Sequence, residues 1–237
     1  MKKKTLSVKQ INELLGRLQG DKKLLYDKKY MEQLYLEYQE NDIDDTLDVQ
    51  ALKELFGSRK LLLLGTGDSV TEQEELLKNF INENNPIVIS MNYIPDNISP
   101  DMIFLSNSKK YVQIASKLSR HQGEYKIIAT SNVTKTSGEF DYTVRYKDVL
   151  DTEENAIPDV AFAVLLKTME KVGVKEVYLG GIDGFNETHN GIYLDDEEHC
   201  DYGIKHTDEL NEYVNHMMQR MNKTIKLNLL TKSIYTL

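Results

Sequence analysis

The sequence predicts an α/β protein of the doubly wound type, with a mostly parallel sheet, helices on both faces and a small helical appendage at the N-terminus. From Arg59 onward, short apolar runs alternate with longer segments of helical periodicity, as in a parallel sheet that is covered on both faces. The first of these runs, Leu61–Leu64, leads directly into the turn Gly65-Thr66-Gly67-Asp68-Ser69. A glycine turn between a buried strand and a helix is typical of phosphate binding.

We expect the chain to divide into a helical appendage, residues 1–57, and a Rossmann-like nucleotide-binding domain, residues 58–237. Apolar residues at helical spacing predict one helix from Ser7 to Gly20 and a second over about Lys22–Gln39. A third, short helix is marked by Leu47, Ala51, Leu52 and Leu55 and ends at Gly57. These helices are too small to bury much apolar surface alone, so we expect them to pack on the following domain or on a piece that this chain lacks.

Short apolar runs predict the strands and the longer periodic segments predict the helices between them. The predicted strands are Lys60–Leu64, Ile87–Met91, Met102–Leu105, Lys126–Ala129, Tyr142–Arg145, Glu176–Leu179 and Thr224–Leu227. The predicted helices are Thr71–Asn84, Lys109–His121, Pro158–Val172 and Thr207–Met221. The third helix is apolar around most of its circumference, so we expect it to be buried.

Two polar stretches, Thr130–Asp141 and Asp183–Lys205, fit no regular element. Loops of this length in a domain are usually functional or disordered. Both stretches follow predicted core strands, at the end where parallel sheets bind their ligands.

Composition limits the classes of partner and compartment. The chain has 237 residues, of which 40% are hydrophobic and 28% charged, so a packed core is expected. Its net charge of -9 argues against a nucleic-acid or anionic-membrane surface. No apolar run approaches the roughly 20 residues of a membrane span. The one cysteine, Cys200, has no partner for an internal disulfide, and we expect a cytoplasmic protein in a reducing compartment.

The glycine turn is the strongest local motif. Gly65 and Gly67 allow a tight turn and the close approach of a phosphate, and Ser69 with the amides of the helix start can donate to it. Val70 stands where a dinucleotide-binding motif has its third glycine, and no Walker lysine follows. The alternative interpretation is a tight turn alone, and Asp68 favours it by placing a negative charge beside the proposed anion.

Three further candidates follow predicted strands. Asn92 and Asn107 could bind a ribose or base through their side-chain amides, so together with the glycine turn, which includes Thr66, they favour a nucleotide. Either Asn can also be an ordinary strand-end residue. Asp183, in Gly180-Gly181-Ile182-Asp183, could orient a sugar hydroxyl or a metal-bound phosphate, and the alternative is a turn-capping aspartate.

His206 directly precedes the last predicted helix. A neutral imidazole there could act as general base toward an acceptor hydroxyl or as general acid toward a leaving phosphate. The alternative is an exposed histidine near a helix start. His199, Cys200 and His206 match no zinc spacing, so no metal site is predicted from them.

With these motifs, residues 59–237 resemble bacterial sialyltransferases that use CMP-activated sialic acid, and related domains similar to 6-hydroxymethylpterin diphosphokinase. The sialyltransferase turn Gly-Asn-Gly-Pro-Ser reads Gly65-Thr66-Gly67-Asp68-Ser69 here, and the family's Ser-Gly-Ile-Asp reads Gly180-Gly181-Ile182-Asp183. The resemblance implies glycosyl transfer from a nucleotide sugar without a cofactor. It implies nucleotide contacts from Asn92 and Asn107 and a catalytic base at His206 in Lys205-His206-Thr207.

The resemblance is partial, because Thr66 and Asp68 replace the asparagine and proline of the sialyltransferase turn, and Pro158-Asp159 replaces a Ser-Gly pair. The diphosphokinase likeness implies instead pyrophosphoryl transfer from ATP with Mg²⁺, for which Asp68 and Asp183 could supply carboxylates.

Residues 4–39, with the tyrosine-rich Tyr30-Met31-Glu32-Gln33-Leu34-Tyr35-Leu36-Glu37-Tyr38, are similar to the segment that follows the barrel in bacterial aldolase-type proteins related to hydroxymethylglutaryl-CoA lyase and 4-hydroxy-2-oxovalerate aldolase. This resemblance implies that the chain is the portion after a barrel, a non-catalytic binding or assembly module whose partner is that barrel or a second copy. The chain has neither the metal-binding residues of an aldolase nor an eightfold βα pattern.

Overall fold

The computed structural model describes residues 43–57, 59–107, 110–111, 114–115, 117–118, 123–133, 140–153, 156–157, 160–186 and 207–237. The first two predicted helices lie outside these ranges, as do most of the predicted helix 109–121 and large parts of both polar stretches.

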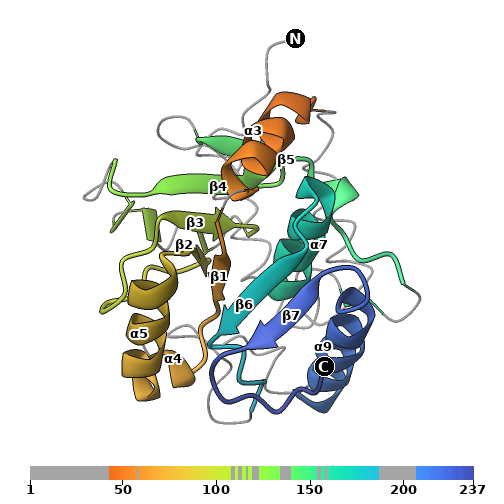
Figure 1. Ribbon diagram of the computed structural model, residues 1–237. Helices are drawn as coiled ribbons and strands as arrows, with labels where there is room; N and C mark the ends of the chain where they lie inside the picture. The colour runs from red at the N-terminus through yellow and green to blue at the C-terminus, as the bar shows by residue number, and fades with distance from the viewer. Residues whose placement is uncertain are drawn as a thin grey trace.

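The core is a seven-stranded sheet in the order β5-β4-β3-β2-β1-β6-β7, and every neighbouring pair is parallel (Figure 1). The predicted doubly wound α/β fold is therefore confirmed. The strands are β1 Leu61–Leu64, β2 Ile87–Met91, β3 Met102–Leu105, β4 Lys126–Thr130, β5 Tyr142–Val144, β6 Glu176–Gly180 and β7 Lys226–Leu229.

The predicted strand ends agree with the structure within one residue except at β7. The prediction for β7 was wrong by two residues, because the amides of Thr224 and Ile225 still donate to Met221 O at the end of the preceding helix. The sheet pairing therefore begins only at Lys226, whose amide donates to Lys175 O.

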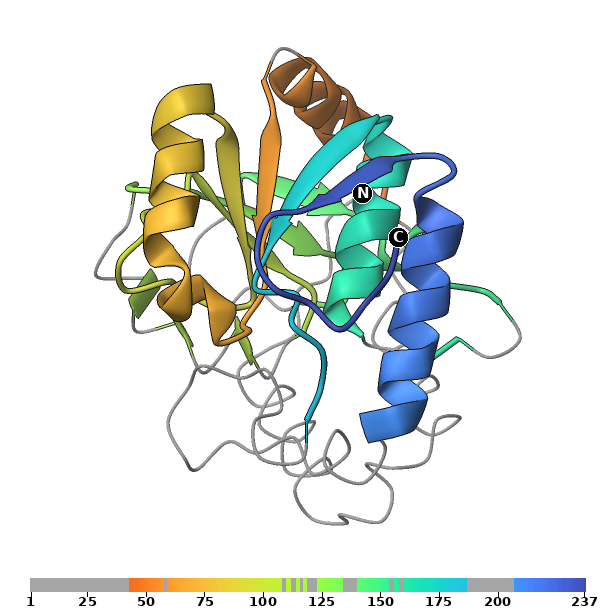
Figure 2. The ribbon, with the colours of Figure 1, turned by 60° about the horizontal axis from the view of Figure 1, so that its bottom comes forward.

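Helices cover both faces of the sheet (Figures 1 and 2). Helices α4 (Ser69–Glu72) and α5 (Glu74–Asn84) lie on one face, and α7 (Ala161–Val172) and α9 (Thr207–Met221) lie on the other. Most residues of α7 are buried, as its apolar circumference predicts. Among the described helices, none is both long and apolar enough to cross a bilayer.

The single helix predicted over Thr71–Asn84 is in fact two helices, so this prediction was wrong. The chain breaks at Gln73, with φ -117° and ψ 29°. The side-chain carbonyl of Gln73 accepts the amide of Lys232 from the last segment of the chain, at 2.7 Å. The helix is thus interrupted where a segment distant in sequence attaches to it.

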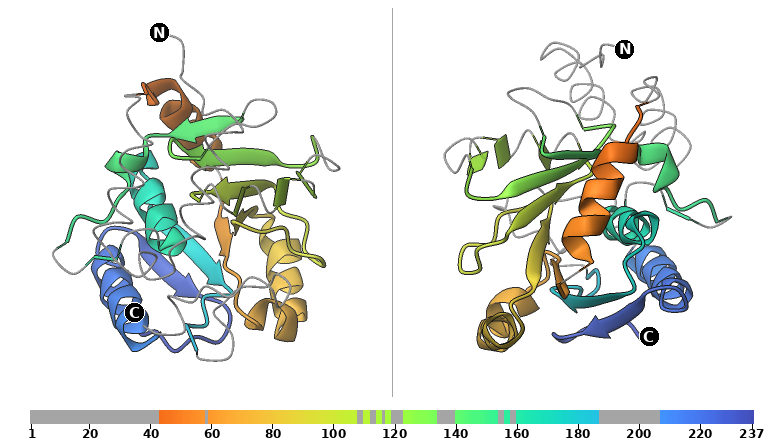
Figure 3. Two further views of the ribbon diagram at one scale, coloured as in Figure 1. Left: turned by 180° about the vertical axis from the view of Figure 1, so that it is seen from behind. Right: turned by 45° about the horizontal axis from the view of Figure 1, so that its top comes forward.

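Helix α3 (Thr46–Phe56) lies beside β5 and α7 at one end of the sheet (Figure 3). Its side chains Leu52 and Phe56 are buried in the same core cluster as residues of the strands, α7 and α9. Leu47, one of the residues that mark the predicted helix, is 83% exposed. The helix buries the side of Leu52 and Phe56 instead. Whether residues 1–57 form a separate appendage stays a prediction, but α3 packs into the core of the sheet domain.

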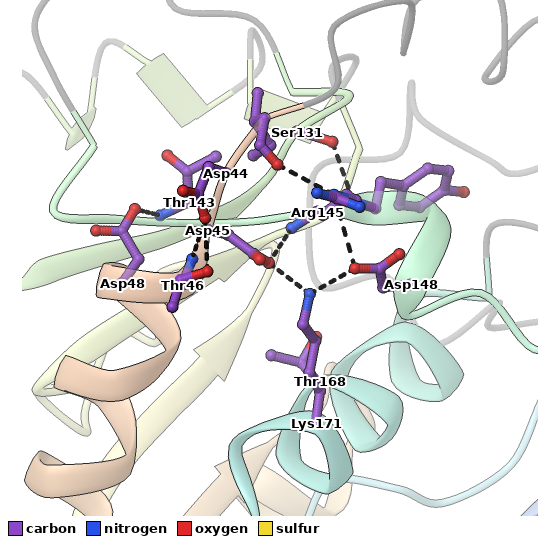
Figure 4. A network of polar contacts seen from close by, with 12 residues as sticks. Asp44, Asp45, Thr46, Asp48, Ser131, Thr143, Arg145, Asp148, Thr168 and Lys171 are labelled. Atoms are coloured by element: carbon purple, nitrogen blue, oxygen red, sulfur yellow. Dashed lines mark hydrogen bonds and ion pairs between the residues drawn. The ribbon is translucent and has the colours of Figure 1, made fainter.

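Acidic side chains at the start of α3 bind the outer edge of β5, where no neighbouring strand lies among the described residues (Figure 4). The carboxylate of Asp48 accepts the amide of Thr143 at 2.9 Å, and that of Asp45 accepts the amide of Arg145 at 2.7 Å. Lys171 of α7 donates to the same Asp45 oxygen at 2.5 Å. We call Asp45, Asp48, Thr143, Arg145 and Lys171 the edge clamp.

Candidate functional site

The order in which the chain adds strands to the sheet reverses between β1 and β6. From β1 the chain builds outward to β5, and it then returns to add β6 and β7 on the other side of β1. Doubly wound sheets bind their ligands outside the carboxyl ends of the strands at such a switch point. The glycine turn follows β1 and Gly181–Asp183 follows β6, so the structure brings both predicted motifs to this place (Figure 2).

The two glycines of the turn allow the backbone after β6 to approach closely. The amide of Gly65 donates to Gly180 O at 2.8 Å, and that of Gly67 donates to Gly181 O at 3.0 Å. A Cβ at Gly65 would lie 2.4 Å from Gly181 O, and one at Gly67 would lie 2.4 Å from the Asp183 carboxyl carbon. Side chains at these two positions are therefore incompatible with the observed packing.

Asp183 binds the donors at the start of α4. One carboxylate oxygen accepts the Ser69 amide at 2.8 Å, and the other accepts the Ser69 hydroxyl. The Ser69 hydroxyl also lies 2.8 Å from that of Thr231. The sequence pointed to both Ser69 and Asp183 but not to their contact, and in the structure the carboxylate takes the donors that were predicted for a phosphate.

Thr66 lies within the glycine turn, and Lys232 lies in the segment after β7. Thr66 is half-buried, and we find no hydrogen bond of its amide or hydroxyl within the described part of the chain. The hydrogen bond to Glu72 raises the pKa of Lys232 above its usual range, and the negative charges of Asp183 and Asp68 add to this. The ammonium group of Lys232 is thus paired with Glu72 at the end of α4.

The side-chain oxygens of Asn92 and Asn107 accept hydrogen bonds from backbone amides. Asn92 has a left-handed φ of 61° and its side-chain oxygen accepts the amide of Ser106 at 3.1 Å, which ties the end of β2 to that of β3. Asn107 accepts the amide of Lys110 at 3.2 Å and so caps the segment that begins there. Their predicted contacts with a nucleotide stay predictions.

His206 lies outside the described residues, and its role as a base stays a prediction. Helix α9 begins at the next residue, Thr207, at the carboxyl edge of the sheet (Figure 2). Asn211 of α9 holds the chain after β6 there, because its side chain accepts the amide of Phe185 at 2.8 Å and donates to Phe185 O at 2.9 Å.

Thr231 and Lys232 were missed by the sequence analysis. They follow β7 at the carboxyl edge, and the rule that selected Asn92 and Asp183, a polar residue just after a core strand, could have found them. The prediction ended the last strand at Leu227, four positions before Thr231 and five before Lys232, whereas β7 ends at Leu229.

The magnesium site that the diphosphokinase likeness implies, with carboxylates from Asp68 and Asp183, stays a prediction. Both oxygens of Asp183 accept hydrogen bonds from Ser69, and the Lys232 ammonium lies near Asp183 and Asp68. Among the described residues, no group of three or more His, Cys, Asp or Glu side chains could hold a metal ion. His199 and Cys200 lie outside the described residues.

No protein-family model matches the chain, and a search of the curated proteins finds no match. The sialyltransferase, diphosphokinase and aldolase resemblances therefore stay predictions.

Proposed function

We propose that the chain binds a nucleotide or a nucleotide-activated sugar at the carboxyl edge of the sheet, across the ends of β1 and β6. The observation that supports this most is the carboxylate of Asp183, which two bonds from Ser69 hold at the switch point. A carboxylate offers about four acceptor positions, so roughly two remain for a ligand. Sugar hydroxyl groups are donors that suit them.

We expect the phosphate groups of such a ligand at Thr66 of the turn rather than at Ser69. A phosphate at the Ser69 amide would meet the negative charge of Asp183, and like charges repel. Thr66 of the turn offers an amide and a hydroxyl, and Lys232 offers a positive charge. Together they supply donors for a phosphate next to the sugar position.

Calorimetric titration with CMP, UMP, GTP, ATP and CMP-sialic acid, each with and without Mg²⁺, tests this proposal. The wild-type chain should bind at least one of them, and Asp183→Asn should weaken that binding roughly tenfold, because a charge-assisted bond to a ligand hydroxyl is lost. Glu176→Gln is the matched control, since it changes a carboxylate at the amino end of the same strand, where it pairs with Lys226. If the wild-type chain binds none of these compounds, the proposal fails and the assembly-module alternative is favoured.

Glycosyl transfer from the bound nucleotide sugar is the reaction that we propose, with His206 as the base. His206→Ala should abolish transfer of sialic acid to a model acceptor while the affinity for the nucleotide stays within about twofold. His216→Ala, an exposed histidine of α9, is the control and should leave the rate unchanged. An unchanged rate in His206→Ala would remove His206 from the mechanism.

A further inference from the structure

The segment after β7 crosses the carboxyl ends of β6 and β1 (Figure 2). The amide of Lys232 donates to the Gln73 side chain at 2.7 Å, and that of Ile234 donates to Asp183 O at 3.0 Å. Tyr235, which is buried, donates its hydroxyl to Asn211 of α9 at 2.8 Å. The segment is thus attached to the start of α5, to the end of β6 and to α9, and it reaches Asp183 itself.

Thr231 is the residue of this segment that touches the glycine turn. Its hydroxyl oxygen accepts the amide of Gly181 at 2.9 Å and lies 2.8 Å from the Ser69 hydroxyl. Thr231 is 7% exposed and Ser69 is fully buried, so water does not compete for these bonds.

The directions of these hydrogen bonds follow from the number of protons. A hydroxyl group has one proton, and an ionised carboxylate only accepts. Because the Ser69 hydroxyl donates to Asp183, the bond between the two hydroxyls must be donated by Thr231. The chain of donors therefore runs from the Gly181 amide through Thr231 and Ser69 to the carboxylate, and each bond strengthens the next.

We propose that Thr231 is a positioning residue for Asp183, and that the carboxylate it orients recognises sugar hydroxyl groups rather than a phosphate. The second part of this proposal rests on the proposed function. The chain of hydroxyls fixes the carboxylate as an acceptor at the carboxyl edge. A sugar brings donors to that acceptor, whereas a phosphate brings negative charge and further acceptors.

The positioning role is tested in the ligand-free protein by NMR. The amide proton of Ser69, which bonds the carboxylate, should shift upfield in Thr231→Val, where the donor is lost and the volume is kept. Thr231→Ser, which keeps the hydroxyl, should restore the wild-type shift. Thr236→Val is the control, because Thr236 is exposed in the same segment and bonds Gln219 rather than the turn. A Ser69 amide signal that is the same in Thr231→Val as in the wild type would overturn the positioning role.

Recognition of sugar hydroxyls is tested by comparing CMP-sialic acid with cytidine 5′-diphosphate, which lacks the second sugar. Thr231→Val should weaken the binding of CMP-sialic acid roughly tenfold and that of the diphosphate less than about twofold, with rescue by Thr231→Ser. Equal losses for both ligands would overturn this part, because a general structural defect would affect both.

The outcomes separate the two proposals. If the wild-type chain binds neither ligand, the proposed function and the recognition of sugar hydroxyls fail together, and the Ser69 amide signal alone decides the positioning role. If Thr231→Val does not fold, Thr231→Ala takes its place in both measurements, since it removes the same hydroxyl.

Discussion

At the scale of single residues, Gly67 shows how a missing side chain shapes the site. The carboxyl group of Asp183 occupies the space that a Cβ at Gly67 would need. The glycine that the sequence assigned to phosphate binding thus serves the approach of the protein's own carboxylate. The sequence predicted a close approach to the backbone at Gly67, and in the structure the Asp183 carboxyl group approaches it. Phosphate binding by the turn stays a prediction.

Gly67→Ala should lower the free energy of unfolding by about 1 to 3 kcal/mol, because the added methyl group forces Asp183 away from Ser69 in a packed region. Urea unfolding measures this loss. Gly57→Ala is the control: Gly57 has a helical φ of -65°, which alanine adopts readily, so its stability should change by less than about 1 kcal/mol. Equal stabilities of Gly67→Ala and the wild type would show that Asp183 can move without cost.

At the scale of secondary-structure elements, α3 completes the sheet. An edge strand leaves amides without a sheet partner, which is a risk for association with other chains. In the edge clamp, Asp48 and Asp45 bind the amides of Thr143 and Arg145, two alternate residues whose amides point outward from β5. The helix therefore supplies side-chain acceptors where a further strand would supply carbonyl groups (Figure 4).

Asp45→Asn should lower the free energy of unfolding by about 1 to 3 kcal/mol, because the charge-assisted bonds to Lys171 and to the Arg145 amide are weakened at a mostly buried position. Glu54→Gln in α3 is the control, since the Glu54 carboxylate is exposed and bonds Gln50. Urea unfolding of both variants gives the comparison. If Asp45→Asn is as stable as Glu54→Gln, the clamp contributes nothing to the fold.

At the scale of the whole molecule, two buried tyrosines link stability to alkaline pH. Burial raises the pKa of Tyr213, and the adjacent Asp151 charge raises it further. Burial also raises the pKa of Tyr235. Since the pKa of each is higher in the folded chain than the usual value of about 10, the unfolded chain loses these protons first. The stability they contribute is full below about pH 10 and falls as the pH rises further.

The free energy of unfolding should therefore decrease between about pH 9 and pH 11, and the double variant Tyr213→Phe/Tyr235→Phe should show a shallower decrease over the same range. Urea unfolding at a series of pH values measures both slopes. The variant is expected to be less stable than the wild type at neutral pH, because it loses the hydroxyl bonds to Asp151 and Asn211. Identical slopes for the two proteins would mean that these tyrosines do not report the alkaline transition.

Most of the secondary structure could be predicted because it depends on local patterns. The apolar runs of β1, β2 and β3 and the periodicity of α9 are readable over a few residues, and their ends were predicted within one residue. The break at Gln73 could not be predicted in this way, because its partner Lys232 is 159 residues away.

The candidate site likewise has a part that local sequence patterns predict and a part that they do not. The residue types at the carboxyl edge, Gly65, Gly67, Ser69 and Asp183, follow from their places after core strands, which the sequence displays. That Asp183 reaches Ser69 across 114 residues, that Thr231 reaches Ser69 across 162, and that Asp45 reaches the amide of Arg145 across 100 depend on which strands become neighbours. Strand order arises from the packing of all the elements at once, so these contacts became visible only in the folded chain.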